Sequence, residues 1–225
     1  MARFTRRTSA LSHGEQGAAK LSLDSVNLIK VQIMANKQEP RKMYEIKISL
    51  SESNPLIWRR VQVPRDLTLY QLHQVIQTAM GWDDEHLHEF KIGQKRYASS
   101  RNEYADFDNS MGNEDIARLN GVAKPKSKTK IIYTYDFGDS WQHDIQIECE
   151  LESDSPERQA RCVAGENACP PEDSGGLYGY YDKLDTLDDP LDSEYEHTRE
   201  WLGEDFDPKH FDREATNRRL SQLEV

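Results

Sequence analysis

Two histidines separated by a single residue are the first side chains in this chain with a spacing suited to metal binding. They are His86 and His88, in the stretch HLHEF. Side chains two positions apart on a strand point to the same face, so a strand here would place both imidazoles together. Neutral imidazole is the commonest metal ligand in proteins. The pair predicts a divalent metal such as zinc, although H-x-H by itself has little specificity.

A second group of polar side chains lies in the stretch YDFGDSWQHD. Asp136, Asp139 and His143 bracket a turn in which Gly138 is expected to supply a positive φ. Carboxylates beside a histidine can bind a cation or act as acid and base. The plainer interpretation is an acidic hairpin whose Trp141 packs into the core.

The third group is the stretch RCVAGENACPPEDSGG, which holds two of the three cysteines. Cys162 and Cys169 stand seven positions apart, wider than the gap of most zinc knuckles. The stretch could be a metal loop, a thiol pair or a tight structural turn. With His86 and His88 the two cysteines would complete a tetrahedral Cys2His2 zinc site, if the fold brings them together.

Two acids follow these cysteines, and they have two interpretations. Glu172 and Asp173 precede Gly175 and Gly176, which allow a sharp turn into the next helix. The acids are therefore expected either to cap that helix or to contribute to a site.

The elements that position these residues follow from hydrophobic periodicity. Apolar residues alternate in 44–50 and 56–64, which predicts two strands paired as a hairpin. A helical period over 69–80, with Thr68 or Asp66 as cap and Gly81 at the end, predicts a helix with His73 as a packed core-edge residue. Further strands are expected in 86–93, 95–99, 130–136 and 141–151, and helices in 177–187, 193–203 and 208–224.

Strands before residue 151 and helices after it predict an α+β fold. We expect an antiparallel or mixed sheet with one helix inserted after the first hairpin, and a C-terminal helical segment packed on the sheet. The predicted organisation is an N-terminal arm of poor order, residues 1–42, and one domain over 43–225. That domain is strand-rich in 43–151 and helix-rich in 174–225.

Charge is distributed unevenly over the 225 residues, whose net charge is −11. Residues 1–42 carry eight Lys/Arg against three Asp/Glu, and residues 150–225 carry eight against twenty-one. A chain this acidic lacks the general basic surface by which proteins bind DNA or RNA. The basic arm is expected to be a solvated tail, with contact to nucleic-acid phosphates as the lesser alternative. The acidic third predicts a solvated face, a cation site or a basic partner.

No stretch of the sequence predicts export or membrane insertion. The N-terminus is basic but lacks an apolar core, and no apolar run approaches the ~18 residues of a membrane span. With three cysteines and no export signal, we expect a cytoplasmic protein without structural disulfides and without a membrane partner.

Several motifs in fixed order resemble the plasmid pRiA4b ORF-three-like family, also described as TnpR-like passenger proteins of insertion elements. They are PLIWRRVQVPRDLTLYQLHQVIQTAMGWDDEHLHEFKIG, YTYDFGDSWQHDIQIE, RCVAGENACPPEDSGGLYGYYDKL and EWLGEDFDPKHFD. The resemblance covers residues 44–220 and implies an α+β domain with a link to plasmids and mobile elements. The TnpR description would imply a resolvase, but the sequence places no activated serine among arginines around a phosphate.

The three groups of polar side chains are expected to line one cleft, for which we weigh three functions. The first is a binding or adaptor module for a peptide, a basic partner or a small ligand, with Trp82 and Trp141 as apolar contacts. The second is a metal-dependent hydrolase or nuclease, and the third a structural zinc protein without catalysis. The cleft candidates are His86, His88, Asp136, Asp139, Trp141, His143, Glu172 and Asp173, and the candidate metal ligands are His86, His88, Cys162 and Cys169.

Overall fold

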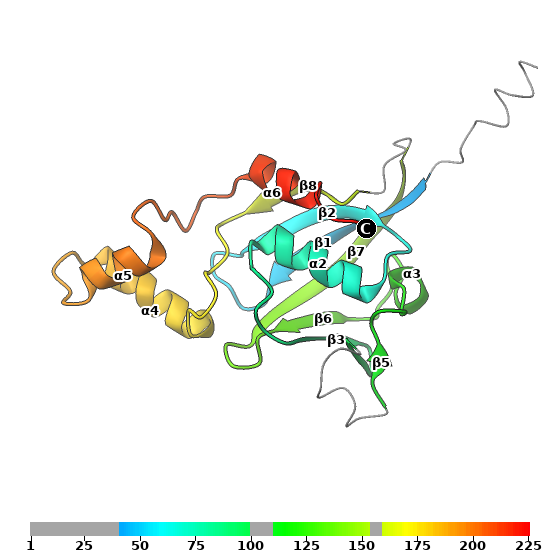
Figure 1. The fold of residues 1–225 in the computed structure, drawn as a ribbon, viewed down its shortest axis with the longest axis horizontal. Coiled ribbons are helices and arrows are strands. Elements are labelled where there is room, and N and C mark those ends of the chain that lie inside the picture. Colours follow the sequence, from blue (N-terminus) through cyan, green and yellow to red (C-terminus); the bar gives the residue numbers. More distant parts are fainter. Residues whose placement is uncertain (1–40, 100–109, 154–158) are drawn as a thin grey trace, which may run out of the picture. The chain divides into compact units, whose positions relative to one another are not determined.

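Eight strands form one mixed sheet, and the predicted hairpin lies within it (Figure 1). The spatial order is β5-β4-β3-β6-β7-β1-β2-β8, and every neighbouring pair is antiparallel except β4 with β5. The strands are β1 (Arg41–Leu50), β2 (Trp58–Pro64), β3 (His88–Ile92), β4 (Lys95–Ala98), β5 (Gly112–Asn113), β6 (Ile131–Tyr135), β7 (Trp141–Ser153) and β8 (Arg161–Glu166).

This computed structural model describes residues 41–99, 110–153 and 159–225, which belong to one compact unit, Pro40–Val225. The predicted arm, 1–42, lies outside the described residues except for its last two. Arg41 and Lys42 are already part of β1, paired with the end of β7. The sheet therefore begins two residues before the predicted domain boundary.

The helix predicted after the hairpin is confirmed as α2 (Leu69–Met80). Thr68 and Gln71 form a reciprocal capping box at its start, and Gly81 ends it at φ +100°. Its apolar stripe is buried in the main core, together with the inward side chains of β1 and β2. The buried stripe is Leu69, Leu72, Val75, Ile76, Ala79 and Met80.

The helix-covered face of the sheet is aromatic and histidine-rich where β3, β6 and β7 lie side by side. Tyr133 is directly opposite His143, and Tyr135 is opposite both His88 and Trp141. Side chains alternate between faces along a strand, so these residues share the face beneath α2. All of them are buried.

The other helices of the described residues are α3 (Leu119–Val122), α4 (Gly176–Asp188), α5 (Tyr195–Leu202) and α6 (Arg213–Leu220). The helix α6 packs against β8 and α2, and α4 packs against α5. The helix predicted over 208–224 is shorter than expected and begins after Asp212, whose carboxylate accepts from the amide of Ala215. The expected cap of α5 is also displaced, because Glu194 rather than Asp192 or Ser193 precedes it.

The cysteine stretch contains a strand, which the sequence analysis did not predict. Residues Arg161–Glu166 form β8, an edge strand paired antiparallel with β2. Cys162 is therefore a buried strand residue opposite Val61 rather than part of a loop. The remainder of the stretch leads into α4.

Candidate functional site

Three segments far apart in the sequence meet at one end of the sheet. They are the segment after α2 (82–87), the turn between β6 and β7 (136–140) and the segment before α4 (169–175). The indole nitrogen of Trp82 donates to the carbonyl of Pro170 at 2.9 Å, which joins the first segment to the third. The carboxylate of Asp139 accepts from the amide of Gly175 at 2.9 Å, which joins the second to the third.

Tyr135 connects two of these segments through its hydroxyl, and its strand leads directly into the third. The oxygen accepts from the amides of Glu85 and His86, at 2.9 and 3.2 Å, and the hydroxyl donates to the carboxylate of Glu172. The other oxygen of Glu172 accepts from the amide of Asp83 at 3.2 Å. Burial and the neighbouring Glu172 raise the pKa of Tyr135, so the hydroxyl keeps its proton and remains a donor.

In the turn between β6 and β7, the residues with positive φ are not the predicted Gly138. Asp136 and Ser140 have φ of +54° and +56°, whereas Gly138 is not in the left-handed region. Aspartate tolerates this conformation because its short carboxylate bonds nearby backbone. Here Oδ1 of Asp136 accepts from the amide of Gly138 at 2.8 Å, which leaves Oδ2 for other partners.

Glu172 and Asp173 do not cap α4, in contrast to one of the two predicted interpretations. The residue before the helix is Gly175 in the left-handed region, and no side chain caps it. Gly176 approaches the turn so closely that a Cβ there would lie 2.6 Å from the carbonyl oxygen of Asp139. Glycine at this position allows the loop before α4 to close over the turn between β6 and β7.

His86, Asp136 and Asp173 come together where the three segments meet. Nε2 of His86 lies 3.3 Å from Oδ1 of Asp173 and 4.0 Å from Oδ2 of Asp136. One ligand atom from each residue lies within 4.8 Å of the other two. Nε2 of His86 is buried and has no hydrogen-bond partner among the described residues. Asp173 remains exposed, so the group opens to solvent.

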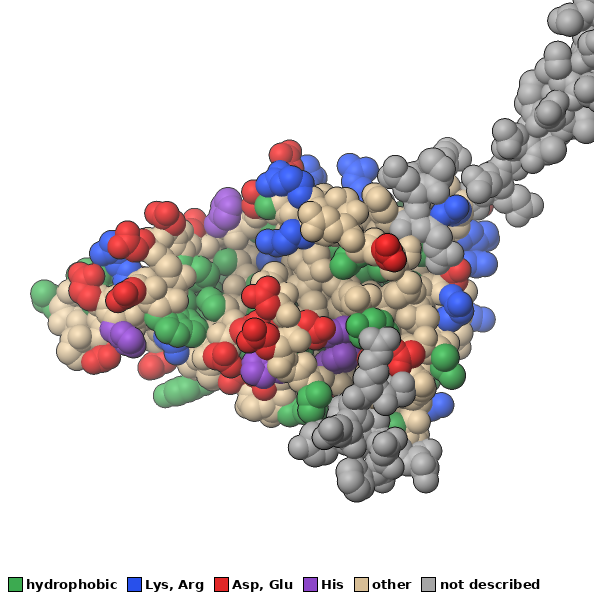
Figure 2. All heavy atoms as spheres, viewed as in Figure 1, with side chains coloured by type: hydrophobic (Ala, Val, Ile, Leu, Met, Phe, Trp, Pro, Cys, Tyr) green, Lys and Arg blue, Asp and Glu red, His purple; other side chains and the backbone are tan. Residues whose placement is uncertain are grey.

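The surroundings of this group are strongly acidic, as the red side chains near the purple histidines in Figure 2 show. Within the described ranges, no lysine or arginine forms an ion pair with the carboxylates of these three segments. Carboxylates so close together repel one another, and a bound cation would relieve the repulsion. The carboxylates are Asp83, Asp84, Glu85, Asp136, Asp139, Glu172 and Asp173.

The two histidines of HLHEF belong to different groups. His86 lies before β3 begins, so the alternation that applies within a strand does not place it beside His88. His88 is the first residue of β3 and lies beneath α2, where its Nε2 contacts both carboxylate oxygens of Glu114 at 3.0 and 3.1 Å. His73 stacks on His88.

The structure does not bring together the predicted Cys2His2 set. Among the described residues, the groups of three or more potential metal ligands contain no cysteine, and they separate His86 from His88. Cys162 donates through its thiol to the carbonyl of Ala164 at 3.3 Å. Cys169 packs against the core, and burial raises the pKa of its thiol to about 12. Both side chains are packing residues here, and neither forms a disulfide.

Three buried rings lie beneath the site and do not line it. They are Trp82, Trp141 and His143. Trp141 and His143 are almost fully buried, and Trp82 is 7% exposed, so the predicted apolar contacts are not available at the surface. Nδ1 of His143 lies 3.1 Å from the carbonyl of Trp141, to which it donates. Burial lowers the pKa of His143 to about 4, which keeps the ring neutral.

Sequence reasoning missed Tyr135, Asp84, His73 and Glu114 as members of polar clusters. Asp84 lies 3.0 Å from His73, and both residues are close to His88. The spacing D-x-H-x-H over 84–88 was an available signal, but Glu114 had none, because only the sheet topology brings it to His88.

Comparison with known proteins identifies the family of this chain. Residues 42–215 match the family described as Plasmid pRiA4b ORF-3-like protein. The chain belongs to this family. It is 35% identical over 158 residues to the uncharacterized protein y4hQ of Sinorhizobium fredii, covering 70% of this chain and 79% of that protein.

A solved structure shows the same fold. The crystal structure of a protein of unknown function, MM3350, from Methanosarcina mazei is 38% identical and superposes with a TM-score of 0.71, covering 77% of this chain and 97% of that one. The α+β class predicted from the sequence is confirmed. In the part of the chain that the structure describes, no helix is long and apolar enough to cross a membrane.

Proposed function

We propose that this protein is a divalent-metal-dependent hydrolase whose ion is held by His86, Asp136 and Asp173. The observation that carries the proposal is the meeting of these side chains from three separate segments at ligand spacing. One imidazole and two carboxylates suit Zn²⁺ or Mn²⁺. Catalytic zinc sites have three protein ligands and keep a position open for water, and the exposure of Asp173 supports such a position.

The chemistry follows from the ion and its acidic surroundings. A divalent ion lowers the pKa of a bound water, so that hydroxide forms near neutral pH and can attack a carbonyl or phosphoryl group. The ion also offsets the repulsion that the surrounding carboxylates would exert on an anionic substrate. One case of this proposal is activity on phosphodiesters of plasmid or mobile-element DNA. The family description motivates this case, but the acidic surface of the chain disfavours it.

The test uses Asp136→Asn, a substitution that the backbone accepts. Asparagine also tolerates a φ of +54° and keeps an oxygen for the amide of Gly138. We expect purified protein to bind Zn²⁺ or Mn²⁺ in calorimetry and to hydrolyse p-nitrophenyl acetate or bis(p-nitrophenyl) phosphate. The variant should lose the hydrolytic activity and the metal ion bound at His86, Asp136 and Asp173, while its melting temperature without metal is unchanged.

Asp185→Asn, at an exposed position on α4, is the matched control and should behave as the parent. Metal binding by Asp136→Asn equal to that of the parent would refute the site. Metal binding without hydrolysis of either ester would refute the hydrolase and retain the site.

A binding module for a cationic partner is the second candidate, because no lysine or arginine among the described residues pairs with the carboxylates of the three segments. A lysine-rich or arginine-rich peptide would then compete with the metal ion for the same surface. Peptide affinity that falls steeply with salt, and that survives chelation of metal, would favour this candidate over the hydrolase.

A further inference from the structure

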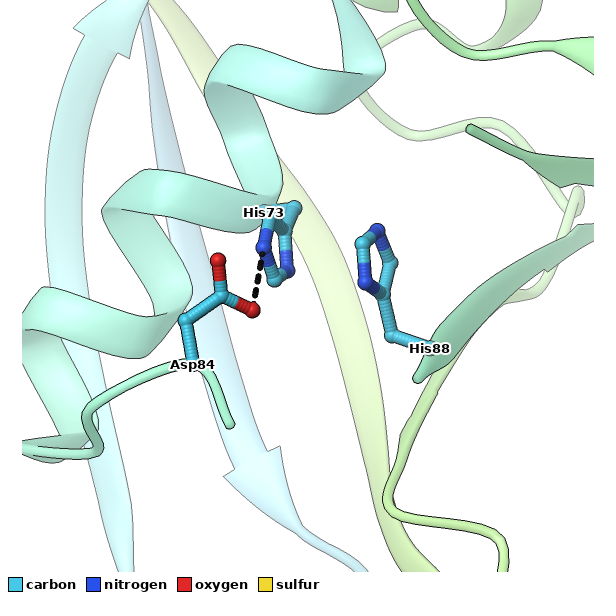
Figure 3. A group of neighbouring side chains, drawn as sticks. All are labelled: His73, Asp84 and His88. Atoms are coloured by element: carbon cyan, nitrogen blue, oxygen red, sulfur yellow. Dashed lines mark ion pairs between the residues drawn. The ribbon is translucent and has the colours of Figure 1, made fainter. Parts of the chain in front are cut away.

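A second polar cluster lies beneath α2, apart from the surface group. His73 projects from α2, Asp84 follows the helix and His88 begins β3, and the three side chains converge in Figure 3. Glu114, which follows β5, lies beside His88. His73 and Glu114 are completely buried, so this cluster has taken polar groups out of water at considerable cost.

One ring nitrogen of His73, Nε2, faces Asp84 but forms no aligned hydrogen bond among the described residues. It is buried and lies 3.0 Å from Oδ1 of Asp84. The opposite nitrogen, Nδ1, lies 2.8 Å from the hydroxyl of Tyr133. Burial lowers the pKa of His73, which favours the neutral ring. The hydroxyl of Tyr133 can donate or accept, so it suits either tautomer of the ring; in the tautomer with its proton on Nδ1, Nε2 would offer a lone pair to an ion held between His73 and Asp84.

His88 is oriented in the corresponding way by a buried carboxylate. Its Nε2 lies 3.0 and 3.1 Å from the two oxygens of Glu114, which can only accept when ionised. Nε2 therefore carries a proton, and Nδ1 has the free lone pair in the neutral ring. A carboxylate that holds the far nitrogen of a histidine is the usual arrangement behind a metal-bound imidazole, since it fixes the tautomer and raises ligand basicity.

We propose that His73, Asp84 and His88 form a second, buried site for a transition-metal ion of the Zn²⁺ class. The ligand atoms of the three residues lie within 4.8 Å of one another. Two imidazoles and one carboxylate are a common zinc ligand set. Glu114 and Tyr133 are positioning residues that orient the two rings.

Metal binding at this site requires one ring to turn. The rings of His73 and His88 are stacked, with centroids 3.5 Å apart and planes within 4° of parallel, whereas an ion lies in the plane of each imidazole that binds it. Rotation of His88 about its Cβ–Cγ bond would bring the ring plane toward the ion, and it displaces Nδ1 more than Nε2 because Nδ1 lies farther from that axis. Nε2 can then stay on Glu114 while Nδ1 moves toward the ion.

The experiment measures Zn²⁺ stoichiometry and affinity by chelator competition, with elemental analysis of the dialysed protein. Asp84→Asn is the test variant, because Asp84 is partly exposed and asparagine accepts its φ of +63°. We expect the full chain to bind two equivalents of Zn²⁺, and Asp84→Asn and Asp136→Asn each to bind one. Glu114→Gln should retain both sites but weaken the buried one about 10- to 100-fold.

A direct readout of the buried site uses Co²⁺ in place of Zn²⁺. Asp84→Asn should abolish the visible absorption of bound Co²⁺ in the Asp136→Asn background, where only the buried site remains. Unchanged Zn²⁺ stoichiometry in Asp84→Asn would overturn the buried site and leave the surface site standing. If the parent binds one ion and Asp136→Asn binds none, the buried site is likewise overturned. If the parent binds one ion that Asp136→Asn retains and Asp84→Asn loses, the buried site is upheld and the surface site is not.

Discussion

The hydroxyl of Tyr135 donates to the carboxylate of Glu172 and joins the end of β6 to the loop before α4. The same oxygen accepts from two backbone amides of the segment that carries His86. One side chain therefore fixes the relative position of two of the segments that supply the proposed metal ligands, and its own strand leads directly into the third.

Tyr135→Phe should loosen this junction. The change removes the hydrogen bonds of the hydroxyl with the carboxylate of Glu172 and the amides of Glu85 and His86, and each such bond contributes about 0.5–1.5 kcal/mol. We expect the free energy of unfolding in urea to fall by about 2 kcal/mol and metal affinity at the surface group to fall with it. Tyr178→Phe, on an exposed side chain, is the control and should change neither. An unchanged urea midpoint in Tyr135→Phe would contradict the role of the hydroxyl.

Gly176→Ala should separate α4 from the turn between β6 and β7. The new Cβ would lie 2.6 Å from the carbonyl oxygen of Asp139, and the φ of +67° is strained for alanine. We expect a loss of about 1–3 kcal/mol in stability, together with weaker metal binding because Asp173 moves. Gly121→Ala meets no atom within 4 Å and should be nearly neutral. Equal melting temperatures for the two variants would show that the close approach is not maintained in solution.

His143→Asn should reduce the dependence of stability on pH. Burial lowers the pKa of His143 from 6.5 to about 4, so between these values the unfolded chain binds more protons than the folded one. The stabilisation is complete above pH 6.5 and is lost as the pH falls toward 4. Asparagine keeps a donor near the carbonyl of Trp141 but does not titrate.

The difference in unfolding free energy between parent and His143→Asn should change by roughly 3 kcal/mol between about pH 7 and about pH 4. Urea titrations across that range measure it. His210→Gln, at an exposed position, serves as the control. Parallel pH profiles for the parent and His143→Asn would count against a buried, neutral His143.

Cys162→Ser should leave metal content unchanged. The thiol is buried in β8 and bonds the carbonyl of Ala164, and no group of potential metal ligands among the described residues includes it. A buried hydroxyl costs more to desolvate than a thiol, so we expect a loss of about 1 kcal/mol in stability. Elemental analysis tests the metal content, and loss of zinc in this variant would restore the Cys2His2 prediction.

Elements whose signals are local could be predicted from the sequence. Alternation in 44–50 and 56–64 predicted the hairpin, and Thr68 and Gly81 predicted the ends of α2, because capping and turn residues act on backbone within a few positions. The strands on either side of DFGD were found for the same reason. The edge strand β8 was missed, because its six residues hold a glycine and two charges and show no clear alternation.

Which polar side chains meet depends on the packing of distant segments. His86 and His88 are two residues apart yet lie in different groups, since β3 begins only at His88. Glu114 reaches His88, and Asp173 reaches His86, only because the sheet order and the loop before α4 bring distant segments together. Side-chain period is set within an element, whereas contacts between loops depend on the packing of the whole sheet and its helices, and no local pattern encodes them.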